Sequence, residues 1–126
     1  MKSHITGLAH IGVFVKDMDT SIDFYKRLGF VLDNEESTDS GVRLAFLSAG
    51  TCLIELIGIN EERGAGKVDH IAMTVDNIEQ AVADANANGI VIDASLISSA
   101  PFFGGIKNVF FAGPDGETLE FFEYCC

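Results

Sequence analysis

Basic residues are scarce in this sequence. Lysine and arginine together number 8, against 19 aspartates and glutamates, which gives a formal net charge of −11. Because a protein that binds nucleic acid normally carries a cluster of cationic side chains, this charge excludes a nucleic-acid partner. An anionic substrate would need specific local cations, and the simplest interpretation of the acidity is solubility.

Long apolar runs and an even set of cysteines are also missing. No run approaches the roughly 20 apolar residues that a membrane span requires, so we expect no membrane partner. The first residues do not combine a basic region with an apolar one, so the sequence predicts no signal peptide. The 3 cysteines include the adjacent pair Cys125 and Cys126, which argues against the disulfide framework of a secreted protein. We therefore expect a cytoplasmic protein.

The sequence contains an internal repeat. A shift of 60 residues lays residues 10–15 over residues 70–75, with histidine on histidine at the first position. Later parts need a shift of 65, which matches Phe46 with Phe111. Five extra residues therefore enter the second copy, and we place them within residues 98–105, SSAPFFGG. Two copies are too few for a solenoid, but they can make a domain of paired modules.

Each copy predicts a strand, a helix and three further strands. With 126 residues, 48% of them hydrophobic, we expect a single domain, 1–126, with module one at about 6–60 and module two at about 66–124. The predicted fold class is α+β: two β-α-β-β-β modules that form a curved, partly open barrel-like sheet with the helices outside. The expected elements are strands at 8–15, 31–32, 42–50, 51–58, 68–75 and 91–92, helices at 20–28 and 77–89, and a hairpin at 108–124.

Local signals support the expected helix starts and one of the turns. Thr20 and Asp23 are spaced as a capping box, and Asn77 stands where the second helix would begin. The first hairpin is expected to turn near Ala49 and Gly50.

Alternation along four of the strands places one imidazole or carboxylate from each strand on the face opposite the helix. In the strand at 8–15, Ile11, Val13 and Val15 point one way and His10 points the other. The same count applies to the other three strands. The polar residues expected to point into the concave side are His10, Glu55, His70 and Glu120.

Four such residues at repeat-equivalent positions favour a metal site. Alone, a strand histidine is more often a hydrogen-bonded structural residue, and a lone glutamate could mark an exposed edge. Two buried carboxylates without partners, however, would cost several kcal/mol each, and a divalent cation removes that cost. Two imidazoles and two carboxylates suit Ni²⁺, Co²⁺, Zn²⁺, Fe²⁺ or Mn²⁺. On a six-coordinate ion they leave two positions for water or substrate.

Two longer segments carry a resemblance to a known family. The segment SIDFYKRLGF (21–30) and the ending PDG…LEF resemble the vicinal oxygen chelate superfamily, the glyoxalase/bleomycin-resistance/extradiol-dioxygenase group, over essentially the whole chain. The resemblance implies a metal site, with Ni, Co or Zn as the expected ion. The ligands that it implies are His10, Glu55, His70 and Glu120.

The ligand order narrows the comparison. The order His-Glu-His-Glu is most similar to bacterial glyoxalase I, whereas extradiol dioxygenases use two His and one Glu. Methylmalonyl-CoA epimerases typically have Gln where Glu55 stands. The resemblance to glyoxalase I implies a lactoylglutathione lyase-like enzyme for methylglyoxal detoxification, acting as a homodimer.

Such an enzyme isomerises the hemithioacetal of a 2-oxoaldehyde and a thiol to a 2-hydroxyacyl thioester, through a metal-bound enediolate. Following the family, Glu120 is the expected base, and Glu55 is a metal ligand and possible second base. The thiol stays open, because glyoxalase I has an arginine four residues beyond the first histidine where this chain has Phe14. Arg43 and Lys107 are the remaining anion anchors. The expected pocket residues are Phe14, Arg43, Asn60, Phe103, Lys107 and Phe122.

Two other functions remain open at this point. One is a non-catalytic protein that binds a small molecule or an antibiotic in an apolar pocket. The other is a different metal-dependent enzyme of the superfamily, an epimerase or a dioxygenase. Stoichiometric metal content separates the first alternative from the enzymes.

Overall fold

The structure is a computed structural model that describes residues 3–58, 66–114 and 116–125. It divides into two compact units: His10–Asp69, called the first unit, and Met1–Ala9 with His70–Cys126, called the second unit. The predicted α+β class with two β-α-β-β-β modules is confirmed; the assignment to a single domain stays a prediction. The elements are β1 (Ile5–Val15), α1 (Met18–Arg27), β2 (Val31–Ser37), β3 (Arg43–Ala49), β4 (Cys52–Gly58), β5 (Val68–Val75), α2 (Ile78–Ala87), the 3₁₀ turn η1 (Ala94–Leu96), β6 (Ser98–Ala100), the 3₁₀ turn η2 (Phe102–Gly104), β7 (Ile106–Ala112) and β8 (Thr118–Tyr124).

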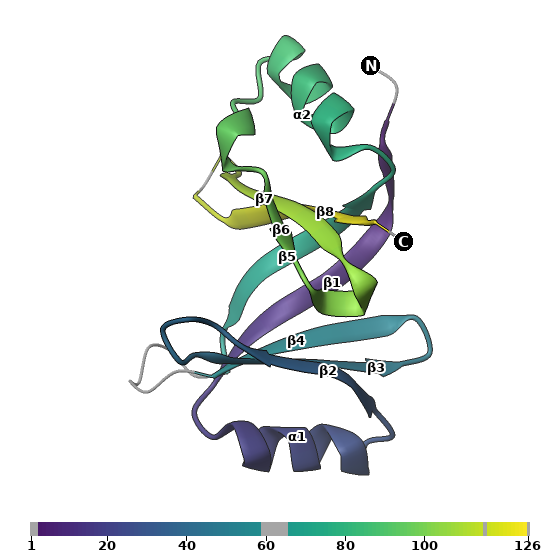
Figure 1. Cartoon of the computed structure of the whole chain (residues 1–126), viewed down its shortest axis with the longest axis vertical. Coiled ribbons are helices and arrows are strands. Elements are labelled where there is room, and N and C mark those ends of the chain that lie inside the picture. Colours follow the sequence, from purple (N-terminus) through teal and green to yellow (C-terminus); the bar gives the residue numbers. More distant parts are fainter. Residues whose placement is uncertain (1–2, 59–65, 115, 126) are drawn as a thin grey trace. The chain divides into compact units, whose positions relative to one another are not determined.

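The first unit is a sheet in the order β2-β3-β4-β1 with α1 on one face (Figure 1). The pairs β2/β3 and β3/β4 are antiparallel, and β4/β1 is parallel. Val15, Leu47 and Leu56 point from the strands into the core beneath the helix. Met18 and Ile22 are the buried residues of α1. Because burying each such side chain contributes about 1.5–3 kcal/mol, this face fixes the helix on the sheet.

Each α-helix starts after a polar residue whose side chain caps the first turn. The sequence predicts this residue correctly only for α2. The side chain of Asn77 accepts a hydrogen bond from the backbone N–H of Gln80 (3.1 Å) and caps α2 as expected. In α1 the capping residue is Asp17, which accepts from the N–H of Thr20 (3.1 Å). The predicted capping box of Thr20 and Asp23 is therefore wrong, and α1 starts earlier than expected.

The second unit repeats this arrangement in the order β5-β8-β7-β6, with α2 over one face (Figure 1). The pair β5/β8 is parallel, whereas β8/β7 and β7/β6 are antiparallel. Met73, Val75 and Phe121 line the helix side of the strands, and Ile78 and Val82 meet them from α2. Both units thus bury an apolar sheet face under one amphipathic helix.

The strand expected at residues 91–92 is wrong. These residues lie between α2 and η1, and Ile92 is buried in the core under α2. The side-chain amide of Asn86 donates to the Ile92 carbonyl and accepts from its N–H, both at 2.9 Å. Because these are the groups that a neighbouring strand would need, no ladder forms here. The strand beside β7 is instead the short β6, inside the segment where the repeat comparison places the extra residues.

The two α-helices are short. Each has 10 residues and is therefore about 15 Å long, half the thickness of a bilayer core. Within the described ranges, no helix is long and apolar enough to cross a membrane.

His4 attaches the amino-terminal segment to the rest of the second unit. Its Nδ1 lies 3.0 Å from Asp76 Oδ1, and its Nε2 lies 2.7 Å from Asp84 Oδ2. Hydrogen bonds to Asp84 and then Asp76 raise the pKa of His4, and the bond to His4 lowers the pKa of Asp84. The charged imidazolium therefore links the start of β1 to α2.

Replacing His4 with Gln tests this contact through its pH dependence. A raised histidine pKa gives stability that is complete below the ordinary value of 6.5 and is lost as the pH rises through the folded-state value. A lowered aspartate pKa gives stability that is complete above 3.8 and is lost in acid. We expect wild type to exceed His4→Gln in thermal stability most between pH 3.8 and pH 6.5, and less in mild alkali. An equal difference at all pH values would contradict the ion pairs.

Candidate functional site

In the first unit, His10 and Glu55 lie side by side on the sheet face that α1 does not cover. Parallel pairing of β1 with β4 sets Gly12 opposite Glu55, so the carboxylate shares a face with Gly12 and His10. His10 is 1% exposed and Glu55 is 8% exposed. The distance from His10 Nε2 to Glu55 Oε1 is 3.4 Å. The predicted placement of these two side chains on one face is confirmed.

Phe46 completes this group, which we call the first half-site. It lies directly opposite Glu55 across the β3/β4 pair, and it is buried. The edge of one ring meets the face of the other between Phe46 and His10, with centroids 5.1 Å apart at 84°. This contact limits the rotation of the imidazole and keeps its Nε2 near the carboxylate.

The second half-site has the same construction in the second unit. Parallel pairing of β5 with β8 sets Ala72 opposite Glu120, so Glu120 shares a face with His70. Both side chains are buried, and His70 Nε2 lies 3.1 Å from Glu120 Oε1. Phe110 lies opposite Glu120, and its ring meets that of His70 at 5.4 Å and 87°.

The two half-sites correspond in register only when Phe46 is matched with Phe110. The match of Phe46 with Phe111 that the sequence predicts is wrong, because Phe111 lies on the helix side and packs against Phe121. The chain advances nine residues from Phe46 to the glutamate opposite it, and ten residues from Phe110 to Glu120. One extra residue in the second hairpin accounts for the error.

Asn108 joins the second half-site, and the sequence analysis missed it. Its side-chain Nδ2 donates to Glu120 Oε2 at 2.9 Å. Asn108 lies two residues before Phe110 on β7, on the same face of the sheet. A polar residue that alternates with Phe110 was the available signal, but it has meaning only once the register of β7 against β8 is known.

The donor atoms of each half-site fit a divalent cation. Two ligands bound at about 2.1 Å to one ion lie about 3.0 Å apart at a right angle and about 3.4 Å apart at a tetrahedral angle. The two separations in this structure are 3.1 Å and 3.4 Å. The longer one exceeds the usual N–H···O distance of about 2.7–3.2 Å. Imidazole nitrogen with carboxylate oxygen suits the borderline ions Ni²⁺, Co²⁺ and Zn²⁺.

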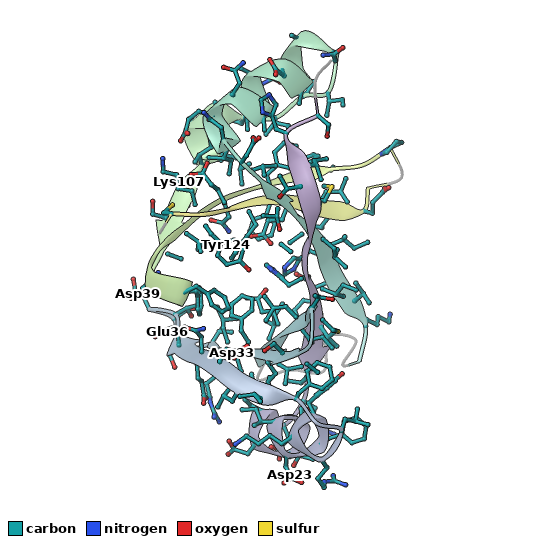
Figure 2. The ribbon with its side chains drawn as sticks, turned by 90° about the vertical axis from the view of Figure 1, so that its right-hand side faces the viewer. Asp23, Asp33, Glu36, Asp39, Lys107 and Tyr124 are labelled. Atoms are coloured by element: carbon teal, nitrogen blue, oxygen red, sulfur yellow. The ribbon has the colours of Figure 1, made fainter. Side chains whose placement is uncertain are left out.

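Arg43 and Lys107, expected as anion anchors, lie on the helix-covered faces of their sheets. Arg43 donates to Asp19 (3.0 Å) and to Glu35 (2.9 Å), and these bonds raise its pKa. Lys107, labelled in Figure 2, donates to Glu79 (3.1 Å), which raises the pKa of Lys107 and lowers that of Glu79. Each cation thus ties a strand to the first turn of its own helix. Their role in substrate binding stays a prediction.

The other expected pocket residues are placed as follows. Phe122 is buried on the carboxylate face of β8, and Phe14 is half-buried on the histidine face of β1. Phe103 lies in η2 with a φ of 51°, in the left-handed region. Asn60 lies outside the described residues.

The sequence of this chain matches a known family over nearly its whole length. Residues 7–121 match the Glyoxalase/Bleomycin resistance protein/Dioxygenase superfamily. The chain therefore belongs to that superfamily, in agreement with the resemblance in the sequence.

Individual proteins are also similar to this chain, in sequence or in fold. The chain is 38% identical to the uncharacterized protein YwbC of Bacillus subtilis (strain 168) over 121 residues, 90% of this chain and 94% of that protein. It is 26% identical to the trivalent organoarsenical cleaving enzyme of Bacillus sp. (strain MD1) over 117 residues, 90% of this chain and 71% of that enzyme. The crystal structure of methylmalonyl-CoA epimerase from Mycobacterium tuberculosis is similar with a TM-score of 0.83 and 24% identity, covering 100% of this chain and 93% of the epimerase. This last likeness shows the fold alone.

The two phenylalanines of the half-sites should differ in their contribution to stability. Phe46 is 1% exposed and Phe110 is 47% exposed. We expect Phe46→Ala to lower the free energy of unfolding by about 3–5 kcal/mol, as for a buried aromatic residue, and Phe110→Ala to lower it by clearly less. Urea denaturation measures both changes. Equal losses would show that Phe110 is buried in solution.

Proposed function

We propose that this protein is a metal-dependent enzyme that moves a proton at a carbon atom beside a carbonyl group of a small-molecule substrate. His10, Glu55, His70 and Glu120, the four ligands expected from the sequence, would hold one divalent cation, and Ni²⁺, Co²⁺ or Zn²⁺ is the expected ion. One observation carries the proposal: each unit buries an imidazole beside a carboxylate at equivalent register positions. Membership of the superfamily agrees with it.

The cation would supply positive charge that acidifies the substrate C–H and stabilises the charge that develops on the neighbouring oxygens. The chain supplies the base. We assign the proton transfer to Glu120, with Glu55 as ligand and second base. Because Glu120 is only 2% exposed, a proton that it accepts is shielded from exchange with bulk water before its return to the substrate.

Two classes of substrate undergo this step. In a hemithioacetal, the proton leaves the carbon that carries the sulfur and returns to the neighbouring carbon, which gives a 2-hydroxyacyl thioester. In a 2-substituted acyl-CoA thioester, Glu120 would remove the proton from one face of C2 and a protonated Glu55 would deliver a proton to the opposite face, which inverts that centre. The order His-Glu-His-Glu, similar to glyoxalase I, supports the first class. The fold likeness to methylmalonyl-CoA epimerase over the whole chain supports the second.

Cleavage of a trivalent organoarsenical is a second candidate function, supported by the relative that is 26% identical over 90% of this chain. It differs from proton transfer because the substrate itself would be cleaved. Homodimer formation and a cytoplasmic location stay predictions from the sequence. Light scattering of the purified protein tests the first of them.

Metal binding is the first test of the proposal. Protein freed of metal by a chelator should bind one equivalent of Ni²⁺ or Co²⁺ in a calorimetric titration. His10→Ala and His70→Ala should each weaken binding more than about 100-fold. Loss of a residue that only orients a ligand costs about 10- to 100-fold in metal affinity, and loss of a ligand itself should cost more. His4→Gln is the matched control, because His4 lies among surface carboxylates of the second unit. Wild-type protein that binds no metal would support the non-catalytic alternative.

A substrate panel with the Glu120→Gln variant tests the chemistry. Metal-loaded wild type should either convert a hemithioacetal to a thioester or convert one C2 epimer of methylmalonyl-CoA into the other. Glu120→Gln should retain the metal through its amide oxygen and lose at least about 100-fold in turnover, the lower range for loss of a general base. The exposed substitution Glu36→Gln is the control. Full activity of Glu120→Gln would assign the proton transfer to another group.

A further inference from the structure

The carboxylate of Glu120 is held from two sides within the second unit. Its Oε1 lies 3.1 Å from His70 Nε2, and its Oε2 accepts a hydrogen bond from Asn108 Nδ2 at 2.9 Å. An ionised carboxylate only accepts hydrogen bonds, so the amide must present its NH₂ group and not its oxygen. The two oxygens of Glu120 therefore have different neighbours, an amide at one and an imidazole at the other.

The strand pairing explains how Asn108 reaches this carboxylate. Phe110 lies directly opposite Glu120, and Asn108 lies opposite Phe122, one step further along the same face. Asn108 and Glu120 are thus diagonal neighbours, about 7–8 Å apart at the backbone, which their side chains can bridge. Rotation of the Glu120 side chain would break this bond, so the bond restricts the carboxylate to one orientation.

The first unit has a different residue at the corresponding place. Phe46 lies opposite Glu55, and the residue two positions before it is Leu44, which lies opposite Ile57. A leucine side chain has no hydrogen-bond donor. Leucine and asparagine share the same branching at Cγ, so the two units provide a natural comparison of this position with and without the amide.

We propose that Asn108 is a positioning residue: its amide holds one oxygen of Glu120 so that the other is directed at the cation, and this makes the two glutamates of the site inequivalent. The inference rests on the proposed metal-binding function. Partners of this kind, which orient a ligand without touching the metal, commonly affect metal affinity by about 10- to 100-fold. Asn108 therefore contributes to affinity through the orientation of Glu120.

The test replaces Asn108 with Leu, which copies the first unit, and with Ala, in case the larger side chain disturbs folding. Both variants should bind Co²⁺ about 10- to 100-fold more weakly than wild type in competition with a chelator. The visible absorption of bound Co²⁺, which reports coordination geometry, should also change. Asn108→Gln keeps an amide and should recover part of the affinity and of the spectrum.

Asn88→Leu is the matched control, because it makes the same change at the end of α2 and should leave both Co²⁺ measurements as in wild type. If wild type binds Co²⁺ and both Asn108 variants bind it equally well with the same spectrum, the positioning role is refuted while the metal site stands. If wild type binds no cation, the proposed function and this inference fail together. A loss of affinity with an unchanged spectrum in all variants would also refute the positioning role, since a general loss of stability gives that result.

Discussion

A carboxylate buried beside an imidazole is the contact on which the rest of each unit depends. Removing Glu55 or Glu120 from water is costly, so the strand that carries it must place a compensating group within reach. The parallel neighbours β1 and β5 supply that group from the same face. The alternate residues of these strands then turn toward the helix, where they must be apolar. The polar site and the apolar core therefore lie on opposite faces of the same strands.

This alternation of side chains is also why much of the structure could be predicted from sequence. Each of four strands of alternating residues carries a histidine or glutamate on the face opposite its apolar residues, and a period of two residues is enough to assign faces. The assignment of His10 and Glu55 to one face needs no knowledge of distant contacts beyond the pairing itself. The N-terminal cap of α2 is equally local, because Asn77 and Gln80 are three residues apart.

The parts that could not be predicted depend on contacts between distant residues. The role of Asn108 follows from the register of β7 on β8, which one extra residue in the hairpin shifts. The loss of a strand at residues 91–92 depends on one asparagine side chain, Asn86, and its two bonds to the backbone. The ion pairs of Arg43 and Lys107 could not be predicted either, because their acidic partners lie far away in sequence. The partners of Arg43 lie on α1 and β2, and the partner of Lys107 lies on α2.

The acidity of β2 has a consequence for association between molecules. Among the described strands β2 pairs only with β3, so it lies at an edge of the sheet, and it carries the exposed acidic residues Asp33 and Glu36, which are labelled in Figure 2. A second molecule that added its own β2 along this edge would bring like charges together across the new ladder, which disfavours the pairing. The carboxylates thus disfavour edge-to-edge association of two molecules, and concentrated salt or acid would weaken this effect.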